Sequence, residues 1–237
     1  MLAAALAQIE ELSKHRAAHD AAKQLAPAVV GILREHRFHN SLLPHLLGGA
    51  ELEPAEYIQV LEALARGDSA TGWVTMTSST SAMLGAYLPR ATASLLWGNA
   101  APMLAGVFAP GGQLVAGVLN GRWSWASGSR HADWFAVGAI FEQRHVVCFV
   151  PSSSVRIVDN WDTLGLAGTG SHDIVIDNAR IAADHTCSLF GAPSSAGAPW
   201  PGTPLYRVPV FGLLAVGIAS CALGIARAAV DHAGARL

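Results

Sequence analysis

The hydrophobic pattern of this chain changes its period twice, and this change limits the folds that the chain can adopt. Over residues 1–97 apolar side chains recur at helical spacing, whereas residues 104–184 show short apolar or alternating runs typical of strands. Helical spacing returns at about Pro209. We therefore predict an α+β fold with a helical N-terminal domain, a β-rich middle and the start of a second helical domain.

The middle region contains many short strand-like runs that are separated by Gly, Pro, Asn and Ser. Such a pattern favours a closed or sandwiched antiparallel sheet, so we predict an antiparallel β-barrel-like domain. The clearest runs cover residues 113–119, 122–126, 134–141, 146–150 and 173–176. The predicted organisation is a helical domain over 1–98, a β domain over 99–190, a Gly-, Ala-, Ser- and Pro-rich linker over 191–207 and one helix over 208–237.

The helix predicted near the end of the chain lacks charge over residues 208–226, a length that can span a bilayer. Gly217, Cys221 and Gly224 fall at helical spacing, where a second helix can pack closely. We favour a buried bundle helix, and a transmembrane helix is the alternative. Because little sequence follows it, we expect the chain to lack most of a C-terminal helical domain.

Charge content limits the partners that we expect for this protein, and cysteine spacing limits its expected location. Charged residues make up only 14% of the chain, against roughly 25% in an average soluble protein, so we expect much of its surface to meet other protein, either in an oligomer or in a domain that the chain lacks. A net charge of −2 without runs of like charge argues against nucleic acid and anionic membranes as partners. Three cysteines without CxxC spacing indicate reduced thiols and a cytoplasmic protein.

A helix expected over residues 69–87, with Asp68 as its N-cap, is unusually rich in hydroxyls for a core helix. These hydroxyls either line a pocket or lie on the helix surface, and the pattern alone favours the surface. They are Thr75, Thr77, Ser78, Ser79, Thr80 and Ser81.

Two sets of residues resemble catalytic or metal sites without completing one. Ser129, His131 and Asp133 have the residue types of a hydrolase triad, but no GxSxG motif is present and residues two apart on one strand do not form a relay. His15 and His19 lie four apart on a predicted helix without a carboxylate to complete a metal set, so we predict solvated histidines and no metal site.

The segment 121–134, GRWSWASGSRHADW, combines three tryptophans with a tight Ser-Gly turn in a strand context. Trp123, Trp125 and Trp134 can simply fill the core of the barrel. Alternatively, they form a flat aromatic wall beside a ring cofactor, toward which Ser127 points its hydroxyl. The composition of the segment leaves both interpretations open.

Several motifs in order resemble those of the acyl-CoA dehydrogenase superfamily: ALARGDSATGW, GVFAPGG, NGRWSWASGSRHADW, WDTLGLAGTGSHDIVID, PLYRVP and LGIARAA. The Trp-Ala-Ser-Gly and Gly-Thr-Gly-Ser stretches are most similar to those of two-component flavin monooxygenases, the aromatic hydroxylases that receive reduced flavin from a separate reductase. The resemblance implies an acyl-CoA dehydrogenase-like fold, reduced FMN or FAD as cofactor, a homotetramer and a flavin reductase as partner. It further implies hydroxylation of a small aromatic or polycyclic substrate with O2.

The resemblance also assigns roles to residues that match the motifs. Trp125 is expected beside the isoalloxazine ring, with the Ser127 hydroxyl near its N5 atom as the catalytic group. Val107 and Phe108 are expected along the pyrimidine edge of the flavin, in part through backbone groups.

Two further pairs complete the site that the resemblance implies. Thr169 and Ser171 match the Gly-Thr-Gly-Ser stretch and are expected to bind the cofactor near the active-site cavity. Thr80 and Ser81 stand where many hydroxylases of this branch carry a histidine that helps to activate a phenol. These two hydroxyls are expected in the substrate pocket, and the substrate need not be a phenol.

Two other functions compete with the monooxygenase. One is an acyl-CoA dehydrogenase-type flavoenzyme that oxidises a CoA thioester; its base in the family is a glutamate from the C-terminal helices, and no Glu follows Glu142 here. The other is a truncated, non-catalytic scaffold without bound flavin. Flavin binding and the response of bound flavin to O2 or to a CoA thioester separate the three.

Overall fold

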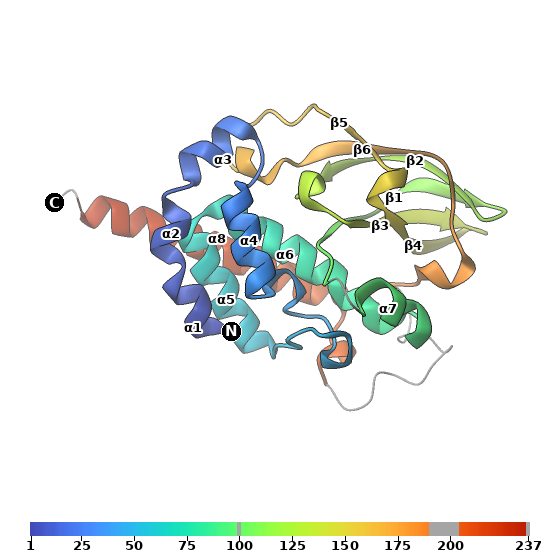
Figure 1. Ribbon diagram of the computed structural model, residues 1–237, viewed down its shortest axis with the longest axis horizontal. Helices are drawn as coiled ribbons and strands as arrows, with labels where there is room; N and C mark the ends of the chain where they lie inside the picture. The colour runs from blue at the N-terminus through green and yellow to red at the C-terminus, as the bar shows by residue number, and fades with distance from the viewer. Residues whose placement is uncertain (99–100, 190–203, 236–237) are drawn as a thin grey trace.

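The computed structural model describes residues 1–98, 101–189 and 204–235. Helices occupy one side of the molecule and a curved sheet the other, and α6 runs along the boundary between them (Figure 1). The helices are α1 (Leu2–Ala7), α2 (Ile9–Ser13), α3 (Arg16–Ala22), α4 (Pro27–Glu35), α5 (Pro54–Gly67), α6 (Ser69–Met83), α7 (Arg90–Trp97) and α8 (Val210–Gly234). The predicted α+β fold, with helices first, strands next and a final helix, is confirmed.

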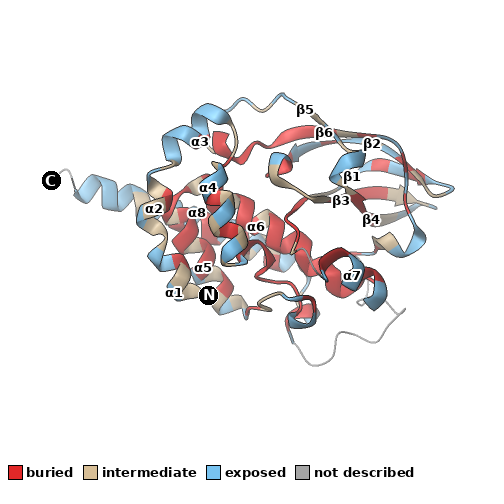
Figure 2. Ribbon diagram, viewed as in Figure 1, coloured by how far each residue is buried: buried red, intermediate tan, exposed pale blue. Residues whose placement is uncertain are grey.

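Helix α6 packs against α5, α8 and β1 and is buried over most of its length (Figure 2). The predicted N-cap is confirmed, because Asp68 Oδ2 accepts hydrogen bonds from the Thr71 backbone N–H at 2.7 Å and from its hydroxyl at 2.6 Å. The favoured prediction, that the hydroxyls of this helix lie on its surface, is wrong. They are tolerated inside because most donate to a carbonyl one turn earlier, as Thr75 does to Thr71 and Ser81 does to Thr77, each at 2.8 Å.

Helix α8 packs one face against α5 and α6 through the small residues Gly217, Cys221 and Gly224, all buried as predicted. The opposite face is exposed and apolar, so the helix is buried on one side only. Among the described residues, α8 alone is long and apolar enough to cross a membrane, with a mean hydropathy of 2.0 over its best window, of which 28% is buried. Its large exposed apolar side chains are Phe211, Ile218, Leu223, Ile225 and Val230.

The sheet has seven strands in the order β5-β6-β2-β1-β3-β4-β7. Neighbouring strands pair antiparallel except β1 and β3, which are parallel, so the expectation of a wholly antiparallel sheet is wrong at this pair. After the β1–β2 hairpin the chain crosses over and lays β3 on the free edge of β1. The strands are β1 (Leu104–Val115), β2 (Val118–Ala126), β3 (Trp134–Phe141), β4 (Arg144–Pro151), β5 (Arg156–Val158), β6 (His172–Arg180) and β7 (Thr186–Cys187).

The run over residues 113–119, predicted as one strand, is divided by the β1–β2 turn. Ala116 and Gly117 occupy the turn with φ of 49° and 75°, the left-handed pair that a two-residue hairpin turn requires. Apolar residues continue on both sides of the turn, which explains why the pattern reads as one strand.

The sheet curves around a core of its own, separate from the core between the helices. Trp123 is the largest side chain in it, 2% exposed, and its indole N–H donates to the Gly138 carbonyl at 2.7 Å. Of the predicted linker, residues 191–203 lie outside the described residues. Residues 204–207 form a 3₁₀ turn in which Tyr206 is buried and donates to the Leu42 carbonyl at 3.2 Å.

Candidate active site

A cavity of about 450 Å³ lies where α6, the strands β1 and β2, the loop between β5 and β6, and α8 meet. Its volume falls within the roughly 300–1,000 Å³ that small-molecule sites occupy. Aromatic and aliphatic side chains line most of it, with hydroxyls along one wall. The lining side chains used below are Trp73, Thr77, Thr80, Ser81, Phe108, Trp125, Ser127, Trp161, Thr169, Ser171 and Phe211.

Of the eight residues that the sequence placed in the site, seven line this cavity: Thr80, Ser81, Phe108, Trp125, Ser127, Thr169 and Ser171. Val107 does not, since its side chain packs against the core of the sheet. The sequence interpretation missed Trp73, Trp161 and Phe211. Trp73 and Trp161 both belong to motifs that carried the resemblance, so their positions in those motifs could have identified them as residues of the site.

A β-bulge turns Trp125 into the cavity. Trp123 and Trp125 are two residues apart and would share one face of a regular strand. However, Trp123 pairs with Ile174 and Ala126 pairs with His172, so β2 holds one more residue than β6 between these points. Trp125 takes a φ of 67° and is 73% exposed. The bulge therefore sends one indole into the core and the other into the cavity, at a strained position of the kind found at functional sites.

A second irregularity, on β1, separates Phe108 from Val107. Val107 pairs with Val137 and Pro110 with the next residue of β3, Gly138, so two residues of β1 stand outside the register. One of them is Phe108, which lines the cavity. Gly138 permits this close approach, because a Cβ there would meet the carbonyl oxygens of Phe108 and Ala109. The resemblance assigned both residues to the flavin edge in part through backbone groups, and the bulge places only the Phe108 side chain in the lining of the cavity.

A chain of hydrogen bonds crosses the polar wall and joins three elements. The Trp73 indole N–H on α6 donates to Ser127 Oγ at 3.1 Å, and Ser127 Oγ lies 2.8 Å from Ser171 Oγ. Ser171 Oγ is 2.7 Å from Thr169 Oγ1, whose hydroxyl donates to the Leu166 carbonyl at 2.8 Å. The three hydroxyl residues are each at most 5% exposed, so their hydrogen bonds form away from bulk water.

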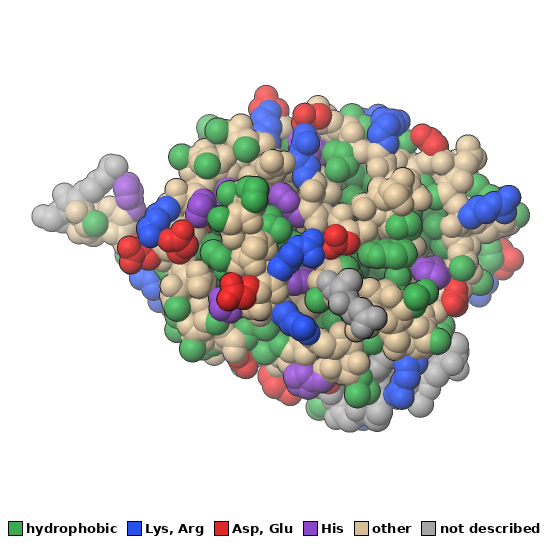
Figure 3. All heavy atoms as spheres, viewed as in Figure 1, with side chains coloured by type: hydrophobic (Ala, Val, Ile, Leu, Met, Phe, Trp, Pro, Cys, Tyr) green, Lys and Arg blue, Asp and Glu red, His purple; other side chains and the backbone are tan. Residues whose placement is uncertain are grey.

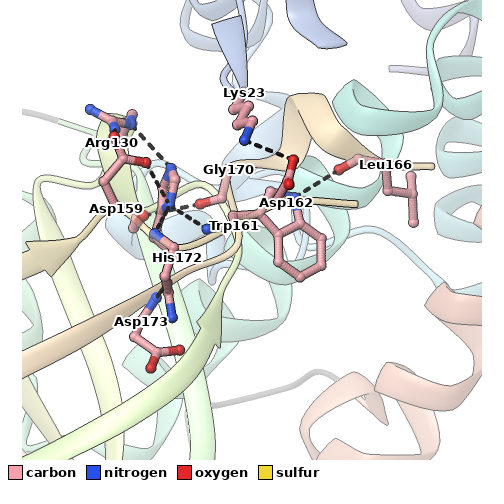
Figure 4. A network of polar contacts seen from close by, with 11 residues as sticks. Lys23, Arg130, Asp159, Trp161, Asp162, Leu166, Gly170, His172 and Asp173 are labelled. Atoms are coloured by element: carbon pink, nitrogen blue, oxygen red, sulfur yellow. Dashed lines mark hydrogen bonds and ion pairs between the residues drawn. The ribbon is translucent and has the colours of Figure 1, made fainter. Parts of the chain in front are cut away.

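Ion pairs at the edge of the site hold the loop that contributes Trp161, Thr169 and Ser171 (Figure 4). Lys23 Nζ reaches Asp162 at 2.9 Å, and an Arg130 guanidinium nitrogen lies 3.0 Å from Asp159. Both carboxylates are exposed, so each pair contributes at most about 1 kcal/mol. Beneath the loop, the ring of His172 is buried, and its pKa is lowered by burial and by the nearby charge of Arg130.

The triad-like residues have structural roles, in agreement with the exclusion of a hydrolase. His131 Nε2 accepts a hydrogen bond from the Leu25 backbone N–H at 3.1 Å. Asp133 accepts from Arg34 at 2.9 Å and thereby joins α4 to the sheet. The Ser129 hydroxyl donates to a backbone carbonyl.

The prediction that His19 is solvated is wrong. It is fully buried, with Nδ1 3.0 Å from Asp68 Oδ2 at the start of α6. His15 Nε2 lies 3.4 Å from Glu11, and its ring stacks on that of His19. Among the described residues, no group of three or more His, Cys, Asp or Glu side chains is arranged to hold a metal ion.

The environment of His131 predicts acid sensitivity. Burial, assisted by the charges of Arg34, His19 and Arg130, lowers the pKa of His131 to about 4. The unfolded chain, with an imidazole pKa near 6.5, therefore binds more protons between pH 6.5 and 4, and the free energy of unfolding falls as the pH falls through that window. The loss from this group is at most about 3 kcal/mol.

Urea unfolding at pH 7 and pH 4.5 measures this loss. His131→Gln keeps an acceptor for the backbone N–H but removes the titration, so we expect a smaller acid-induced loss than in the parent protein. The exposed His232→Gln is the matched control and should behave as the parent. Equal losses in parent and His131→Gln would contradict the assignment. Some loss persists in either case, because burial also lowers the pKa of His39.

Comparison with known proteins agrees with this fold and site. Residues 3–92 match the model of the acyl-CoA dehydrogenase N-terminal domain. The chain is 31% identical to indole-3-acetate monooxygenase of Pseudomonas putida, over 90% of this chain and 56% of that protein. It is 29% identical to the flavin-dependent monooxygenase oxygenase subunit HsaA of Rhodococcus jostii, over 86% of this chain and 58% of that protein.

A solved structure repeats the result in three dimensions. The crystal structure of 3-HSA hydroxylase from Rhodococcus sp. RHA1 superposes with a TM-score of 0.87 at 26% identity, covering 97% of this chain and 64% of that one. The chain thus spans little more than half the length of the curated relatives named above. By its fold and these relatives, the chain contains an acyl-CoA dehydrogenase N-terminal domain within an acyl-CoA dehydrogenase-like fold, and its homologues include monooxygenases such as the flavin-dependent oxygenase subunit HsaA.

Proposed function

We propose that this chain is part of the oxygenase component of a two-component flavin-dependent monooxygenase. It would use reduced flavin and O2 to hydroxylate a small aromatic or polycyclic substrate, and its protein partner would be a flavin reductase. The observation that carries the proposal is the cavity in which the Trp125 indole and the Ser127 hydroxyl meet. The names of the relatives, which are monooxygenases and hydroxylases, support it.

The lining of the cavity suits a flat, largely apolar ring. Trp73, Phe108, Trp125, Trp161 and Phe211 supply planar surfaces on several sides. Among the described lining residues there is no Lys or Arg, so the phosphate of FMN or FAD would lie outside this cavity. When bound, the reduced flavin supplies the two electrons that activate O2.

The side chains of this protein would bind the ring, exclude water and place one polar group. Trp125 would cover the ring, and Phe108 would contact its edge. Ser127 follows the bulged strand and lines the same cavity as Trp125, and we assign its hydroxyl to the flavin N5 position. Productive use of O2 requires that water be kept from the reacting atoms, and the largely apolar lining of the cavity suits this role.

Thr80 and Ser81 are assigned to the substrate side of the cavity. Their hydroxyls donate to the carbonyls of Met76 and Thr77, each at 2.8 Å. What they can offer a substrate is therefore a lone pair, which suits a substrate N–H or O–H. Neither hydroxyl replaces the histidine that other hydroxylases use on a phenol, which favours a substrate that needs no deprotonation.

The CoA-thioester dehydrogenase has less support than the monooxygenase. The names of the relatives, which are monooxygenases, favour oxygenation.

Replacement of Trp125 by alanine should weaken reduced-flavin binding roughly tenfold or more, because loss of an aromatic contact of this size removes more than about 1 kcal/mol. Anaerobic fluorescence titration with reduced FMN and FAD measures the affinities. Val115→Ala, an exposed site on the same sheet away from the cavity, is the control and should bind as the parent does. Equal affinities in both variants would remove Trp125 from the site, and absence of binding in the parent would support the non-catalytic scaffold.

The reaction itself is tested by supplying NADH, flavin, a flavin reductase and candidate aromatic substrates under ¹⁸O2. Incorporation of the label into product supports the proposal. Direct bleaching of bound oxidised flavin by an acyl-CoA, without O2, would instead identify the dehydrogenase.

We further propose that the protein is cytoplasmic and homo-oligomeric. The exposed apolar face of α8 supports assembly, because contiguous apolar surface of this kind usually meets protein. On the face shown in Figure 3, basic and acidic side chains are interspersed rather than gathered in one patch. Light scattering across a concentration series measures the oligomeric state, and a monomer at all concentrations would contradict this part of the proposal.

A further inference from the structure

The hydrogen-bond chain on the cavity wall has only one direction that satisfies all its members. At one end, the Trp73 indole N–H can only donate. At the other end, the Leu166 carbonyl can only accept, so the Thr169 hydroxyl donates its proton to that carbonyl. Both end points are backbone or indole groups whose polarity cannot reverse.

These two ends determine which hydroxyl donates and which accepts in each contact between them. Because Thr169 donates to Leu166, the 2.7 Å contact between Ser171 and Thr169 requires Ser171 to be the donor. Ser171 must then accept in its 2.8 Å contact with Ser127, so Ser127 donates to Ser171. Ser127 also accepts from Trp73, and what remains to it is one lone pair.

The other hydroxyls that line the cavity also donate their protons to acceptors within the protein. Thr77, Thr80 and Ser81 each donate to a carbonyl of α6, and the Trp161 indole N–H donates to the Leu166 carbonyl. Each hydroxyl proton of the described lining side chains thus has an acceptor within the protein. The hydroxyls of the cavity therefore offer a ligand only hydrogen-bond acceptors.

We propose that Thr169 and Ser171 are positioning residues that turn the Ser127 proton away from the cavity, so that the site distinguishes reduced from oxidised flavin. This inference rests on the proposed function. In oxidised flavin the N5 atom carries a lone pair, which the Ser127 lone pair repels. In reduced flavin N5 carries a hydrogen, which Ser127 can accept. The direction of the chain thus favours the redox state that the reductase delivers.

Thr169→Val tests this directly, because it removes the acceptor of the Ser171 proton while nearly preserving the side-chain shape. Ser171 can then donate to Ser127, and the Ser127 proton becomes free to enter the cavity. We expect the ratio of oxidised to reduced flavin dissociation constants to fall about tenfold, the effect of exchanging one hydrogen bond for a repulsive contact. For this two-electron couple, the midpoint potential of the bound flavin should fall by about 30 mV.

Two further variants distinguish a change in the direction of the hydrogen bonds from a general disturbance of the site. Thr169→Ser keeps the hydroxyl and should retain the parental ratio and potential. Trp73→Phe removes only the incoming donor, and the proton of Ser127 still has Ser171 as its acceptor. That variant should therefore keep the parental potential even if both redox forms bind less tightly.

The measurements are equilibrium titrations with oxidised and with anaerobically reduced FMN, and spectroelectrochemical titration of the bound flavin. Equal potentials in Thr169→Val and Thr169→Ser, with flavin bound in both, would overturn the inference and leave the proposed function intact. Absence of binding of either redox form by the parent would overturn the proposed function and this inference with it. If circular dichroism shows that Thr169→Val is unfolded, Ser171→Ala removes the acceptor of Ser127 and must produce the same fall in potential.

Discussion

Trp123→Ala is expected to lower the free energy of unfolding by about 3–5 kcal/mol, the range for truncation of a large buried aromatic side chain. Trp123 is 2% exposed in the core of the sheet, and its loss also leaves the Gly138 carbonyl without its 2.7 Å donor. Trp125→Ala removes the same atoms two residues away, but from a side chain that is 73% exposed. We expect it to cost less than about 1 kcal/mol.

Guanidinium unfolding followed by far-UV circular dichroism measures both variants without relying on indole fluorescence. The pair is its own control, because chemistry, strand and change in volume are identical. Comparable losses at the two positions would mean that Trp125 also packs into the core, and that the bulge does not separate the two side chains.

Gly224→Leu is expected to lower the free energy of unfolding by about 2–3 kcal/mol, as overpacking of a close interface does. A Cβ at this position would meet the Glu62 carbonyl oxygen and, at 2.8 Å, the Ala65 Cβ on α5. Leucine is the better helix former by about 0.8 kcal/mol, so intrinsic propensity alone predicts the opposite sign.

Gly234→Leu is the matched control, since Gly234 is the last residue of the same helix and a Cβ there meets nothing within 4 Å. It should leave stability unchanged or slightly raised. Thermal unfolding resolves the difference, because 1 kcal/mol shifts Tm by about 2–4 °C in a protein of this size. A stable Gly224→Leu would show that α8 does not pack on α5 through its small residues.

The candidate site was predictable to the extent that it lies in local motifs. The Trp-Ala-Ser-Gly and Gly-Thr-Gly-Ser stretches identified Trp125, Ser127, Thr169 and Ser171, and all four line the cavity. Motif letters could not show that Val107 stays with the core while Phe108 leaves it. That distinction depends on two extra residues in the register between β1 and β3, strands that lie about thirty residues apart in the chain.

The order of helices and strands, the N-cap at Asp68 and the small-residue face of α8 were predictable from the sequence alone. Each of these depends on residues close together along the chain, where spacing and capping preferences act. Contacts in the folded chain set the burial of the α6 hydroxyls and of the His19 ring, which of two neighbouring tryptophans faces the cavity, and the direction that we propose for the Ser127 proton. These depend on partners from distant segments, such as Leu166 for that proton, because packing and hydrogen-bond satisfaction are set by neighbours in space.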